Sequence, residues 1–371
     1  MASPRSPTPS PFLLSRLAAC RAKIQEKHVA GYLVTSRADQ YYLTGFDGED
    51  GAALILPERV HLLTDGRFKD VVRRDAPWAR AWVRMGPLAE QLGRLVRKLR
   101  LKTVGFQPAA LTVAALNDFR KAVRPARLVP MPPIVRELRA IKDRSEVSAI
   151  ERAIRVAEEA FGALLRRIRI GWTERRIAAE LLAEMLRRGA AGPSFPIIVA
   201  EGPNSALPHA RPGDRRVRAG SVLLIDWGAV VDHYRSDLTR VVFIRRIPPR
   251  FRRMYGQVLE AQEAAIRAIR PGVPMSAVDA AARRRLQKAG LARYFTHSTG
   301  HGLGLDIHEP PRVAVKIDEP LQAGMVITIE PGVYLPGVGG VRIEDDVLVT
   351  PQGGRVLTRV PKSFDSLVIS G

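Results

Sequence analysis

The sequence predicts two domains of different class: an α/β N-terminal domain, and an α+β C-terminal domain built from an internal duplication. Three observations lead to this prediction. The 371-residue chain is longer than one core usually requires. Its first third alternates helical and strand patterns, and its remainder repeats a helix-glycine-strand pattern at an offset of 101 residues, as from Gly171 to Gly272.

The N-terminal domain is expected over residues 12–133. Residues 1–11 are rich in Ser and Pro, which predicts a disordered tail. The helical pattern of residues 12–27 is followed by apolar strand patterns and a further helix. These strands are expected at 31–36, 51–57 and 60–65, and the helix at 89–100. A proline-rich segment at 125–133 then interrupts regular structure and predicts a linker.

The C-terminal domain is expected over residues 134–371, and it begins with two well-signalled helices. Asp143 and Glu146 form a capping pattern ahead of a long helix that should end near Ile168. Thr173 is the expected N-cap of the second helix, and Gly189 lies where a C-cap glycine belongs. The second copy of this pattern is recognised from matching residues, which are Gly171 with Gly272, Ile177 with Val278, Met185 with Leu286 and Gly189 with Gly290.

Each copy is followed by a predicted hairpin that carries two carboxylates. A simple hairpin centred on Val231 and Asp232 would place Asp226 directly opposite Asp237. The same construction centred on Gly337 pairs Glu330 with Glu344. The duplication therefore predicts two carboxylate pairs, each on one face of its hairpin.

Four carboxylates on apolar strands are costly without cations. Two such groups about 4 Å apart repel by roughly 4 kcal/mol at an effective dielectric constant near 20. Oxygen-rich sites with few imidazoles suit Mn²⁺, and also Co²⁺ or Fe²⁺, better than thiolate-rich zinc sites do. Four carboxylates also balance two divalent ions. The sequence therefore predicts a dinuclear metal centre, with separate solvation or arginine pairing of each carboxylate pair as the alternative.

Composition restricts the other classes of function. The formal charge of +22 invites a nucleic-acid interpretation, but the arginines are scattered in doublets and triplets without interleaved aromatic residues, so nucleic acid is not expected as a partner. No apolar run reaches the roughly 20 residues of a membrane helix. The lone Cys20 and the absence of a secretory signal pattern predict a cytoplasmic location.

The stretch HSTGHGLGLDIHE, residues 297–309, contains three histidines and three glycines. His297 and His301 have the spacing of a helical metal pair, but the glycines make a helix there improbable. Each histidine can therefore bind a metal, act in acid-base chemistry or be structural independently of the others. The glycines are expected to let the backbone pass close to metals and substrate.

Five ordered motifs carry a family resemblance: IDWG with YRSDLTR, then GHGLGLDIHE, TIEPG and VRIED. Together they resemble the metallopeptidases of the pita-bread fold, which include Xaa-Pro aminopeptidases, prolidases and methionine aminopeptidases. The N-terminal half resembles the first domain of the creatinase, prolidase and aminopeptidase P branch. Methionine aminopeptidases commonly lack that domain.

The resemblance implies roles for individual residues. The implied metal ligands are Asp226, Asp237, His301, Glu330 and Glu344. Glu330 would also take the proton of the attacking water, and His209 and His308 would contact substrate and the developing oxyanion. Arg312 matches a position that helps to hold a substrate carboxylate, and His297 would be a supporting group near the metals, outside their direct ligands. Arg342 lies two residues before Glu344 on the same strand face, so strand periodicity also directs it toward the site, where it is a further substrate-binding candidate. Ala210 departs from members that carry a second histidine or similar polar residue, which affects specificity more than activity.

The function expected from these residues is a Xaa-Pro aminopeptidase that uses two divalent ions, Mn²⁺ first among them. The main alternative is a prolidase, restricted to Xaa-Pro dipeptides. A third hypothesis is a binding protein of the same fold that has lost catalysis, but such proteins typically lack the ligands found here. Creatinase-like hydrolysis is disfavoured because that branch works without metal. Proline-containing peptides and a second copy of the chain, in a homodimer, are the expected partners.

Overall fold

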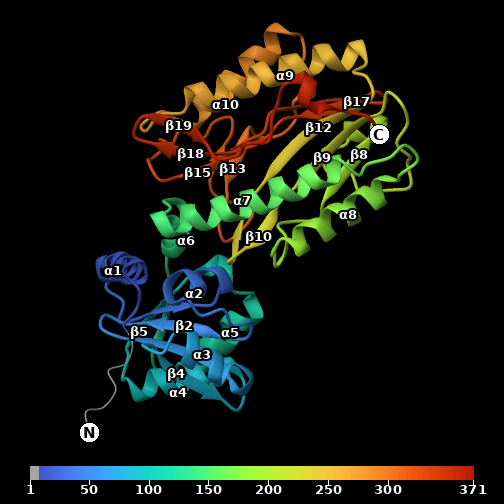
Figure 1. Ribbon diagram of the computed structural model, residues 1–371. Helices are drawn as coiled ribbons and strands as arrows, with labels where there is room; N and C mark the ends of the chain where they lie inside the picture. The colour runs from blue at the N-terminus through green and yellow to red at the C-terminus, as the bar shows by residue number, and fades with distance from the viewer. Residues whose placement is uncertain (1–7) are drawn as a thin grey trace. The chain divides into compact units, whose positions relative to one another are not determined.

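The computed structural model describes residues 8–371 and divides into two compact units (Figure 1). The first unit ends at Arg139 and the second runs from Ala140 to Gly371. The domain limit predicted from the sequence, at residue 133, differs from this division by six residues and stays a prediction. Most of the predicted disordered tail lies outside the described residues, and the helix α1 begins at Pro11.

The N-terminal unit is a mixed sheet with helices, as the alternating pattern predicts. Its strands are β1 (Tyr32–Val34), β2 (Ala52–Ile55), β3 (Val60–Asp65), β4 (Arg80–Arg84), β5 (Thr103–Phe106) and β6 (Arg127–Pro130). Their order is β4-β3-β2-β1-β5-β6, with β1 antiparallel to β2 and parallel to β5. The helices are α1 (Pro11–Glu26), α2 (Arg37–Thr44), α3 (Lys69–Asp75), α4 (Leu88–Lys98) and α5 (Val113–Ala122), and α6 (Ile134–Ala140) leads up to the division.

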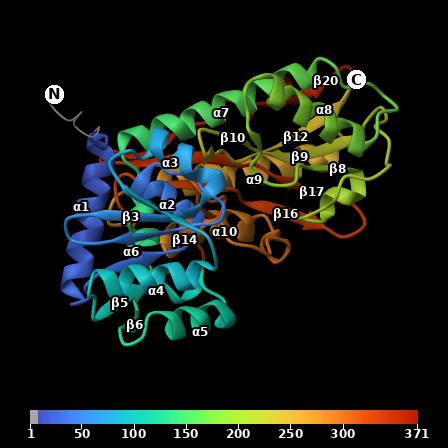
Figure 2. The same cartoon turned by 90° about the horizontal axis from the view of Figure 1, so that it is seen from below.

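The core of the N-terminal unit forms where α4 and α5, which lie side by side in Figure 2, pack against the sheet. Leu33 and Leu54 of the sheet belong to one buried cluster with Leu92 and Leu95 of α4 and Phe119 of α5. The apolar strands predicted from sequence are therefore buried strands.

Four helices of the C-terminal unit follow the duplicated pattern. They are α7 (Arg144–Leu165), α8 (Glu174–Arg187), α9 (Pro249–Ala268) and α10 (Met275–Lys288). Asp143 and Glu146 form the predicted capping box of α7, and the Thr173 side chain caps α8. The helix α7 ends at Leu165, earlier than the predicted Ile168.

The glycines at equivalent positions of the two copies have similar backbone φ angles. Gly171 and Gly272 have φ of 89° and 85°, and Gly189 and Gly290 have φ of 91° and 71°. A left-handed backbone is accessible to glycine at low cost, so each copy needs glycine at the same two places. The predicted duplication is therefore confirmed at the level of the backbone.

The strands of the C-terminal unit form several small sheets. They are β7 (Gly192–Pro193), β8 (Ile198–Glu201), β9 (Val222–Trp227), β10 (Ala229–Val231), β11 (Tyr234–Arg235), β12 (Leu238–Ile244), β13 (Gly300–Gly302), β14 (Glu309–Val313), β15 (Val326–Ile329), β16 (Gly332–Leu335), β17 (Gly339–Arg342), β18 (Asp345–Thr350), β19 (Gly353–Val356) and β20 (Val368–Ile369). The main orders are β20-β12-β9-β8 and β14-β13-β15-β18-β19.

Strand β9 is buried on both faces, which explains its unbroken apolar run. Val222 and Leu224 pack in a cluster with α9 and α10, whereas Leu223 and Ile225 pack with α7 and α8. Figure 1 shows these two helix pairs on opposite sides of the strands. A strand covered on both faces has no solvent side and so needs apolar residues at successive positions. Asp226, at the end of this run, is 7% exposed.

Among residues 8–371, no helix combines the length and the apolar character that crossing a membrane requires.

Candidate metal centre

The first hairpin brings its two aspartates to one face, but in a different register from the predicted one. Asp226 pairs with Thr239, not with Asp237. The turn falls on Asp232 and His233, whose φ values are 48° and 69°. The predicted turn would place β-branched Val231 in a left-handed conformation, which is sterically costly. The partner of Asp226 thus shifts by two residues, and because side chains alternate, Asp237 stays on the same face.

The second hairpin has the register predicted from sequence. Gly332 pairs with Arg342 in β16 and β17, and Ile329 pairs with Asp345 in β15 and β18. Both ladders continue the same alignment on either side of Glu330 and Glu344. The two glutamates therefore occupy corresponding positions in the hairpin, centred on Gly337 as expected.

The two hairpins meet between Thr239 and Glu344. The backbone N–H of Glu344 donates to the carbonyl of Thr239 at 3.2 Å. The Thr239 hydroxyl donates to Glu344 Oε2 at 2.6 Å. This contact brings the carboxylates of the two hairpins to one place.

His301 completes the group. Its Nε2 lies 3.6 Å from Asp237 Oδ2 and 3.4 Å from Glu330 Oε1. One ligand atom each of Asp237, His301 and Glu344 lie within 4.8 Å of one another. His301 belongs to strand β13, as the glycines around it suggested when they argued against a helix.

The carboxylates of this group are destabilised as anions. Burial, and then the charges of Glu344 and Asp226, raise the pKa of Asp237 well above its ordinary value. Burial and the charge of Glu330 do the same to the pKa of Glu344. Burial raises the pKa of Glu330 to about 8, although the charge of Arg342 opposes the shift. Removing these charges from water costs free energy that a nearby cation can offset.

Burial also keeps His301 neutral. It lowers the pKa of His301 to about 3, with a further contribution from His308, whose ring centroid is 4.2 Å away. A neutral imidazole has a free lone pair for a metal. The Nδ1 of His301 lies 3.1 Å from the carbonyl of Gly302, which leaves Nε2 facing the carboxylates.

Arg342 reaches the group, as the strand periodicity predicts, and binds one of its members. Its guanidinium forms an ion pair with Asp226 and donates to Tyr334 Oη at 2.8 Å. It also donates to Thr239 Oγ1 at 3.0 Å and to the carbonyl of Pro208 at 3.3 Å. Arg342 is 4% exposed, and its contact with substrate stays a prediction.

His297 lies behind this arginine. Its Nε2 is 2.9 Å from Tyr334 Oη, and its Nδ1 is 2.8 Å from the carbonyl of Ser298. Burial, and then the charge of Arg342, lower the pKa of His297 to about 4. The chain of contacts from His297 to Asp226 therefore passes through Tyr334 and Arg342.

The other residues with implied substrate roles are exposed. His209 follows the short helix η3 (Gly202–Ala206), and His308 immediately precedes β14. Burial, and then the charge of His209, lower the pKa of His308, so the charge of His209 acts on His308. Arg312 is the ladder partner of His301, and its side chain is exposed.

The glycines around His301 are required by neighbouring strands. A Cβ on Gly300 would lie 1.8 Å from the carbonyl oxygen of Thr328, and one on Gly302 would lie 2.3 Å from that of Pro310. Strand β13 thus approaches β14 and β15 too closely for any side chain at these two positions. The close approach to metal and substrate that the sequence predicts stays a prediction beside these contacts with protein backbone.

Sequence reasoning missed three hydroxyl groups of the site: Thr239, Thr328 and Tyr334. Thr328 accepts the N–H of His301 at 3.1 Å and donates to Glu330 at 3.3 Å. Thr239 and Thr328 each lie two residues from a candidate ligand on the same strand face, so strand periodicity could have found them. Tyr334 is a diagonal neighbour of Arg342 in the predicted register, which is a usable signal as well.

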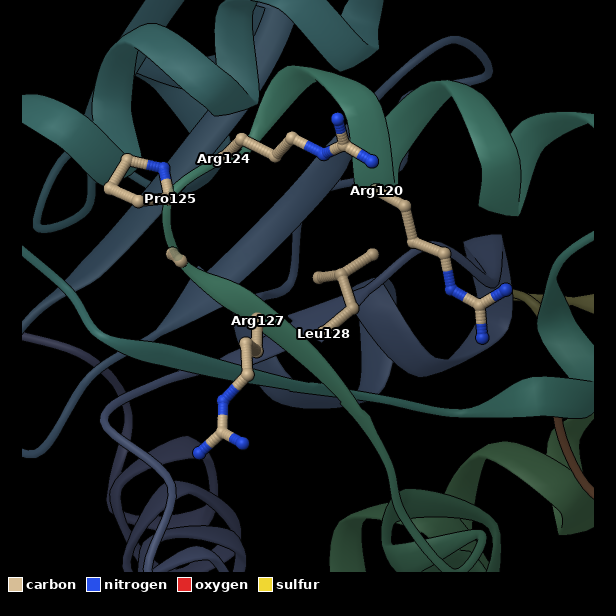
Figure 3. Close-up of a pocket in the computed structure, with 6 residues that line it drawn as sticks. Arg120, Arg124, Pro125, Arg127 and Leu128 are labelled. Atoms are coloured by element: carbon tan, nitrogen blue, oxygen red, sulfur yellow. The ribbon is translucent and has the colours of Figure 1, made fainter.

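A surface hollow of the N-terminal unit has a different character. It is lined by Arg120, Arg124, Pro125, Ala126, Arg127 and Leu128 (Figure 3). None of the candidate site residues lines it, and all of them belong to the C-terminal unit.

The donor set fits divalent cations. Asp237, Glu344 and the neutral imidazole of His301 lie together, Glu330 lies beside His301, and the guanidinium of Arg342 contacts Asp226. The buried Asp226 Oδ1 has no hydrogen-bond partner among the described residues. Oxygen-rich sites of this kind suit Mn²⁺, Co²⁺ or Fe²⁺.

Comparisons with known proteins agree with this geometry. The chain is 39% identical over 263 residues to the Xaa-Pro dipeptidase of Pyrococcus furiosus, covering 71% of this chain and 75% of that protein. The structure of the Xaa-Pro dipeptidase from Bacillus anthracis superposes with a TM-score of 0.92 at 34% identity, covering 96% of this chain and all of that one. The X-Pro aminopeptidase of Thermotoga maritima gives a TM-score of 0.88 at 33% identity, covering 94% and 99%.

The two domains match separate families. Residues 16–141 match the Creatinase/Prolidase N-terminal domain, and residues 148–351 match metallopeptidase family M24. The predicted two-domain architecture and the resemblance to the pita-bread peptidases are thereby confirmed. Membership implies a divalent metal without identifying it. The carboxylate hairpins, the histidine strand and these matches lead to one conclusion: the chain belongs to metallopeptidase family M24 and carries the N-terminal domain of the creatinase and prolidase branch.

Proposed function

We propose that the protein is a dinuclear-metal peptidase that cleaves the bond between an N-terminal residue and a following proline. The observation that carries this proposal is the convergence of Asp237, His301 and Glu344 at metal-binding distances, in a chain whose relatives include named Xaa-Pro dipeptidases.

Five residues would hold the two ions: Asp226, Asp237, His301, Glu330 and Glu344. When bound, the ions would supply Lewis acidity that makes hydroxide available near neutral pH. Mn²⁺ is the proposed ion because the ligand set is rich in carboxylates. Arg342 would hold Asp226 in place, since its guanidinium already bonds to that carboxylate.

Glu330 is the proposed proton carrier. Its raised pKa, about 8 without metal, shows that its environment favours the protonated form. A carboxyl group in such a place can accept a proton from water and deliver it to the leaving nitrogen. Delivery matters because an amide nitrogen is a poor leaving group as an anion. The Thr328 hydroxyl, which donates to Glu330, would orient it.

His209 and His308 are the proposed contacts to the carbonyl oxygen that gains charge during the attack. Both side chains are exposed, so they are accessible to a peptide, and the charge of His209 acts on His308. A donor that strengthens its bond as charge develops lowers the barrier. Arg312 is the proposed contact to a substrate carboxylate.

Of the two substrate classes, we propose the dipeptide. Named Xaa-Pro dipeptidases are found both among the relatives by sequence and among the related structures. The aminopeptidase expected from the sequence is the second candidate, favoured by the similarity to the Thermotoga maritima structure. Both share the same core chemistry and differ in the length of peptide that the cleft accepts.

A metal-reconstituted assay separates these candidates. The protein is freed of metal, loaded with Mn²⁺, and given Ala-Pro and Ala-Pro-Ala at matched concentrations. A prolidase should cleave Ala-Pro with kcat/KM at least about tenfold higher, equivalent to about 1.4 kcal/mol in the barrier. Faster cleavage of the tripeptide would establish the aminopeptidase instead. Asp237→Ala should be inactive on both, and the absence of any cleavage by the wild-type protein would refute the proposal.

The remaining expectations are part of the same proposal. A homodimer and a cytoplasmic location stay predictions, which gel filtration and cell fractionation can test. A catalytically inactive binding protein would be recognised by the failure of the Mn²⁺-loaded protein to cleave either peptide.

A further inference from the structure

The two ligand-bearing hairpins depend on each other at one junction. Asp226 and Asp237 come from the first hairpin, and Glu330 and Glu344 from the second. The backbone and hydroxyl contacts of Thr239 with Glu344 join them. The distance between the two carboxylate pairs therefore depends on the geometry of this junction, and groups that fix the junction also fix that distance.

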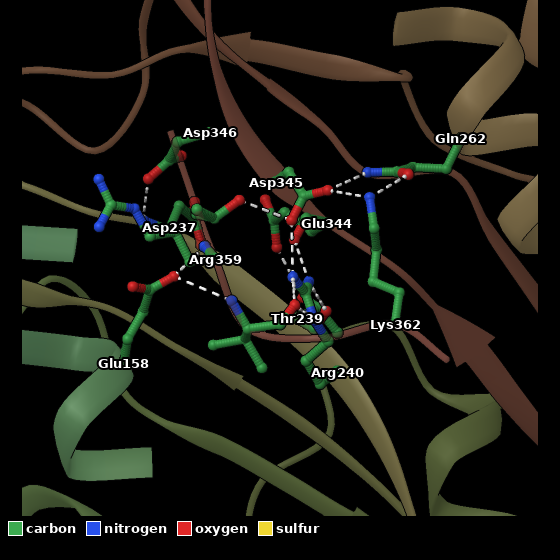
Figure 4. A network of polar contacts seen from close by, with 12 residues as sticks. Glu158, Asp237, Thr239, Arg240, Gln262, Glu344, Asp345, Asp346, Arg359 and Lys362 are labelled. Carbon is green, nitrogen blue, oxygen red and sulfur yellow. Dashed lines mark hydrogen bonds and ion pairs between the residues drawn. The ribbon is translucent and has the colours of Figure 1, made fainter. Parts of the chain in front are cut away.

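Arg240 holds the junction on the side away from the Thr239 side chain. Adjacent residues of a strand point to opposite faces, so Arg240 leaves β12 opposite Thr239. Its Nη1 donates to the carbonyl of Thr239 at 3.0 Å and also to the carbonyl of Glu344 (Figure 4). One guanidinium nitrogen thus binds a backbone carbonyl from each hairpin. The side chain of Arg240 is fully buried.

Asp345 fixes the position of this guanidinium. Its Oδ1 accepts from Arg240 Nη2 and from the hydroxyl of Thr358, both at 2.6 Å. Its Oδ2 accepts from Gln262 Nε2 at 2.7 Å and from the ammonium of Lys362. In Figure 4, Gln262 and Lys362 reach one oxygen of Asp345 and Arg240 reaches the other. Four donors on one carboxylate leave it little freedom to move.

The chain segment 358–362 is held in the same way. The carbonyl of Val360 accepts from Arg240 Nη2 at 2.8 Å and from Nε at 3.3 Å. The N–H of Val360 donates to Glu158 of α7 at 3.1 Å. Arg240 therefore joins both hairpins to a segment that is itself tied to a helix.

A buried ion pair by itself is weak support for a functional role, because apolar residues of similar volume often serve stability as well. Here, however, the guanidinium also contacts the backbone of a candidate ligand, Glu344. Groups that orient metal ligands from behind typically change metal affinity by about 10–100-fold when they are replaced.

We propose that Arg240, held by Asp345, is a positioning residue that sets the spacing of the two hairpins and thereby the affinity of the centre for divalent ions. This inference rests on the proposed function, since it assumes that the carboxylates bind metal. It assigns to Arg240 no contact with substrate.

The test measures metal binding and stability separately. Metal-free wild-type protein and Arg240→Lys are titrated with Mn²⁺ by calorimetry, and their visible absorption with Co²⁺ is compared. A lysine side chain has a single nitrogen, so it cannot donate at once to the carbonyls of Thr239, Glu344 and Val360 and to the carboxylate of Asp345. Arg240→Lys should weaken Mn²⁺ binding by about 10–100-fold and alter the Co²⁺ spectrum.

Two further variants make the result decisive. Lys362→Met is milder, because the Lys362 side chain is 23% exposed and contacts Asp345 without touching a candidate ligand. It should weaken Mn²⁺ binding by about threefold or more, and it decides alone if Arg240→Lys does not fold. Glu184→Gln is the matched control: this carboxylate of α8 binds Arg167, Arg187 and Arg188. It should lower the melting temperature and leave Mn²⁺ affinity within about twofold of wild type.

The possible failures can be told apart. If the folded variants lose stability like Glu184→Gln but bind Mn²⁺ like the wild-type protein, the positioning role is refuted and the proposed function stands. If the wild-type protein binds neither Mn²⁺ nor Co²⁺, the proposed function fails, and the positioning role fails with it.

Discussion

Metal-free protein should lose stability as the pH rises from 6.5 to 8. Burial raises the pKa of Glu330 from its ordinary 4.5 to about 8. A carboxyl group with a higher pKa in the folded state binds its proton more tightly when folded. Its contribution to stability is therefore present at low pH and disappears as the pH rises through the folded-state pKa. The raised pKa values of Asp237 and Glu344 have the same sign.

Histidines set the lower limit of this pH window. Burial lowers the pKa of His301 to about 3 and that of His297 to about 4. These groups contribute stability that is present above the unfolded pKa of 6.5 and is lost as the pH falls toward their folded values. At pH 6.5 they are still half protonated in the unfolded chain, and the loss of that proton by pH 8 stabilises the folded protein by about 0.4 kcal/mol per histidine, which offsets only part of the carboxyl effect.

The size of the effect follows from the same values. At pH 6.5 Glu330 is protonated in the folded protein and ionised in the unfolded chain, and by pH 8 it is about half ionised in the folded protein as well. At 1.36 kcal/mol per pH unit, Glu330 alone accounts for a loss of about 2 kcal/mol. For a unit of residues 140–371, that loss lowers the melting temperature by about 4–8 °C.

Scanning calorimetry in the presence of a chelator measures this slope. Added Mn²⁺ should stabilise the protein more at pH 8 than at pH 6.5, because the metal binds ionised carboxylates. Glu330→Gln is the control and should show a shallower decline with pH. A melting temperature of the metal-free protein that stays constant or rises over this range, or an unchanged slope in Glu330→Gln, would refute the reasoning.

Three substitutions test other parts of the structure. Tyr334→Phe removes a hydroxyl that accepts from Arg342, and it should cost about 1–3 kcal/mol in urea unfolding. No change in the unfolding midpoint would contradict that. Gly300→Ala places a Cβ 1.8 Å from a carbonyl oxygen of β15, so it should prevent stable folding of the C-terminal unit. A wild-type circular dichroism melt would show this to be wrong. Lys142→Met removes the cation from the buried Glu309, 2.7 Å away, and should cost about 3–5 kcal/mol. The double variant Lys142→Met, Glu309→Leu should recover most of that loss. If the losses in unfolding free energy of the two single variants simply add in the double variant, the ion pair is not the cause.

Much of the candidate centre was predictable because it depends on local patterns. Apolar strands that end in acids, as at Asp226, indicate carboxylates drawn into a core. The register of the second hairpin follows from a turn centred on Gly337, which tolerates the left-handed backbone that the turn requires. The first hairpin was misread by two residues because Asp232 and His233, which are not glycines, adopt that conformation. The error did not move Asp237 off the face, since a shift of two preserves alternation.

The sequence alone determined which residues carry charge on buried strands, where helices are capped and that the fold is duplicated, because these properties depend on neighbours along the chain. The tertiary structure decided how the two hairpins meet, which placed Thr239 against Glu344 and Arg240 across both. It also decided that Arg342 binds Asp226, and that Gln262 and Lys362 hold Asp345. These contacts join residues up to 116 positions apart, so they are set by the packing of strands and helices around a common core, which no local pattern encodes.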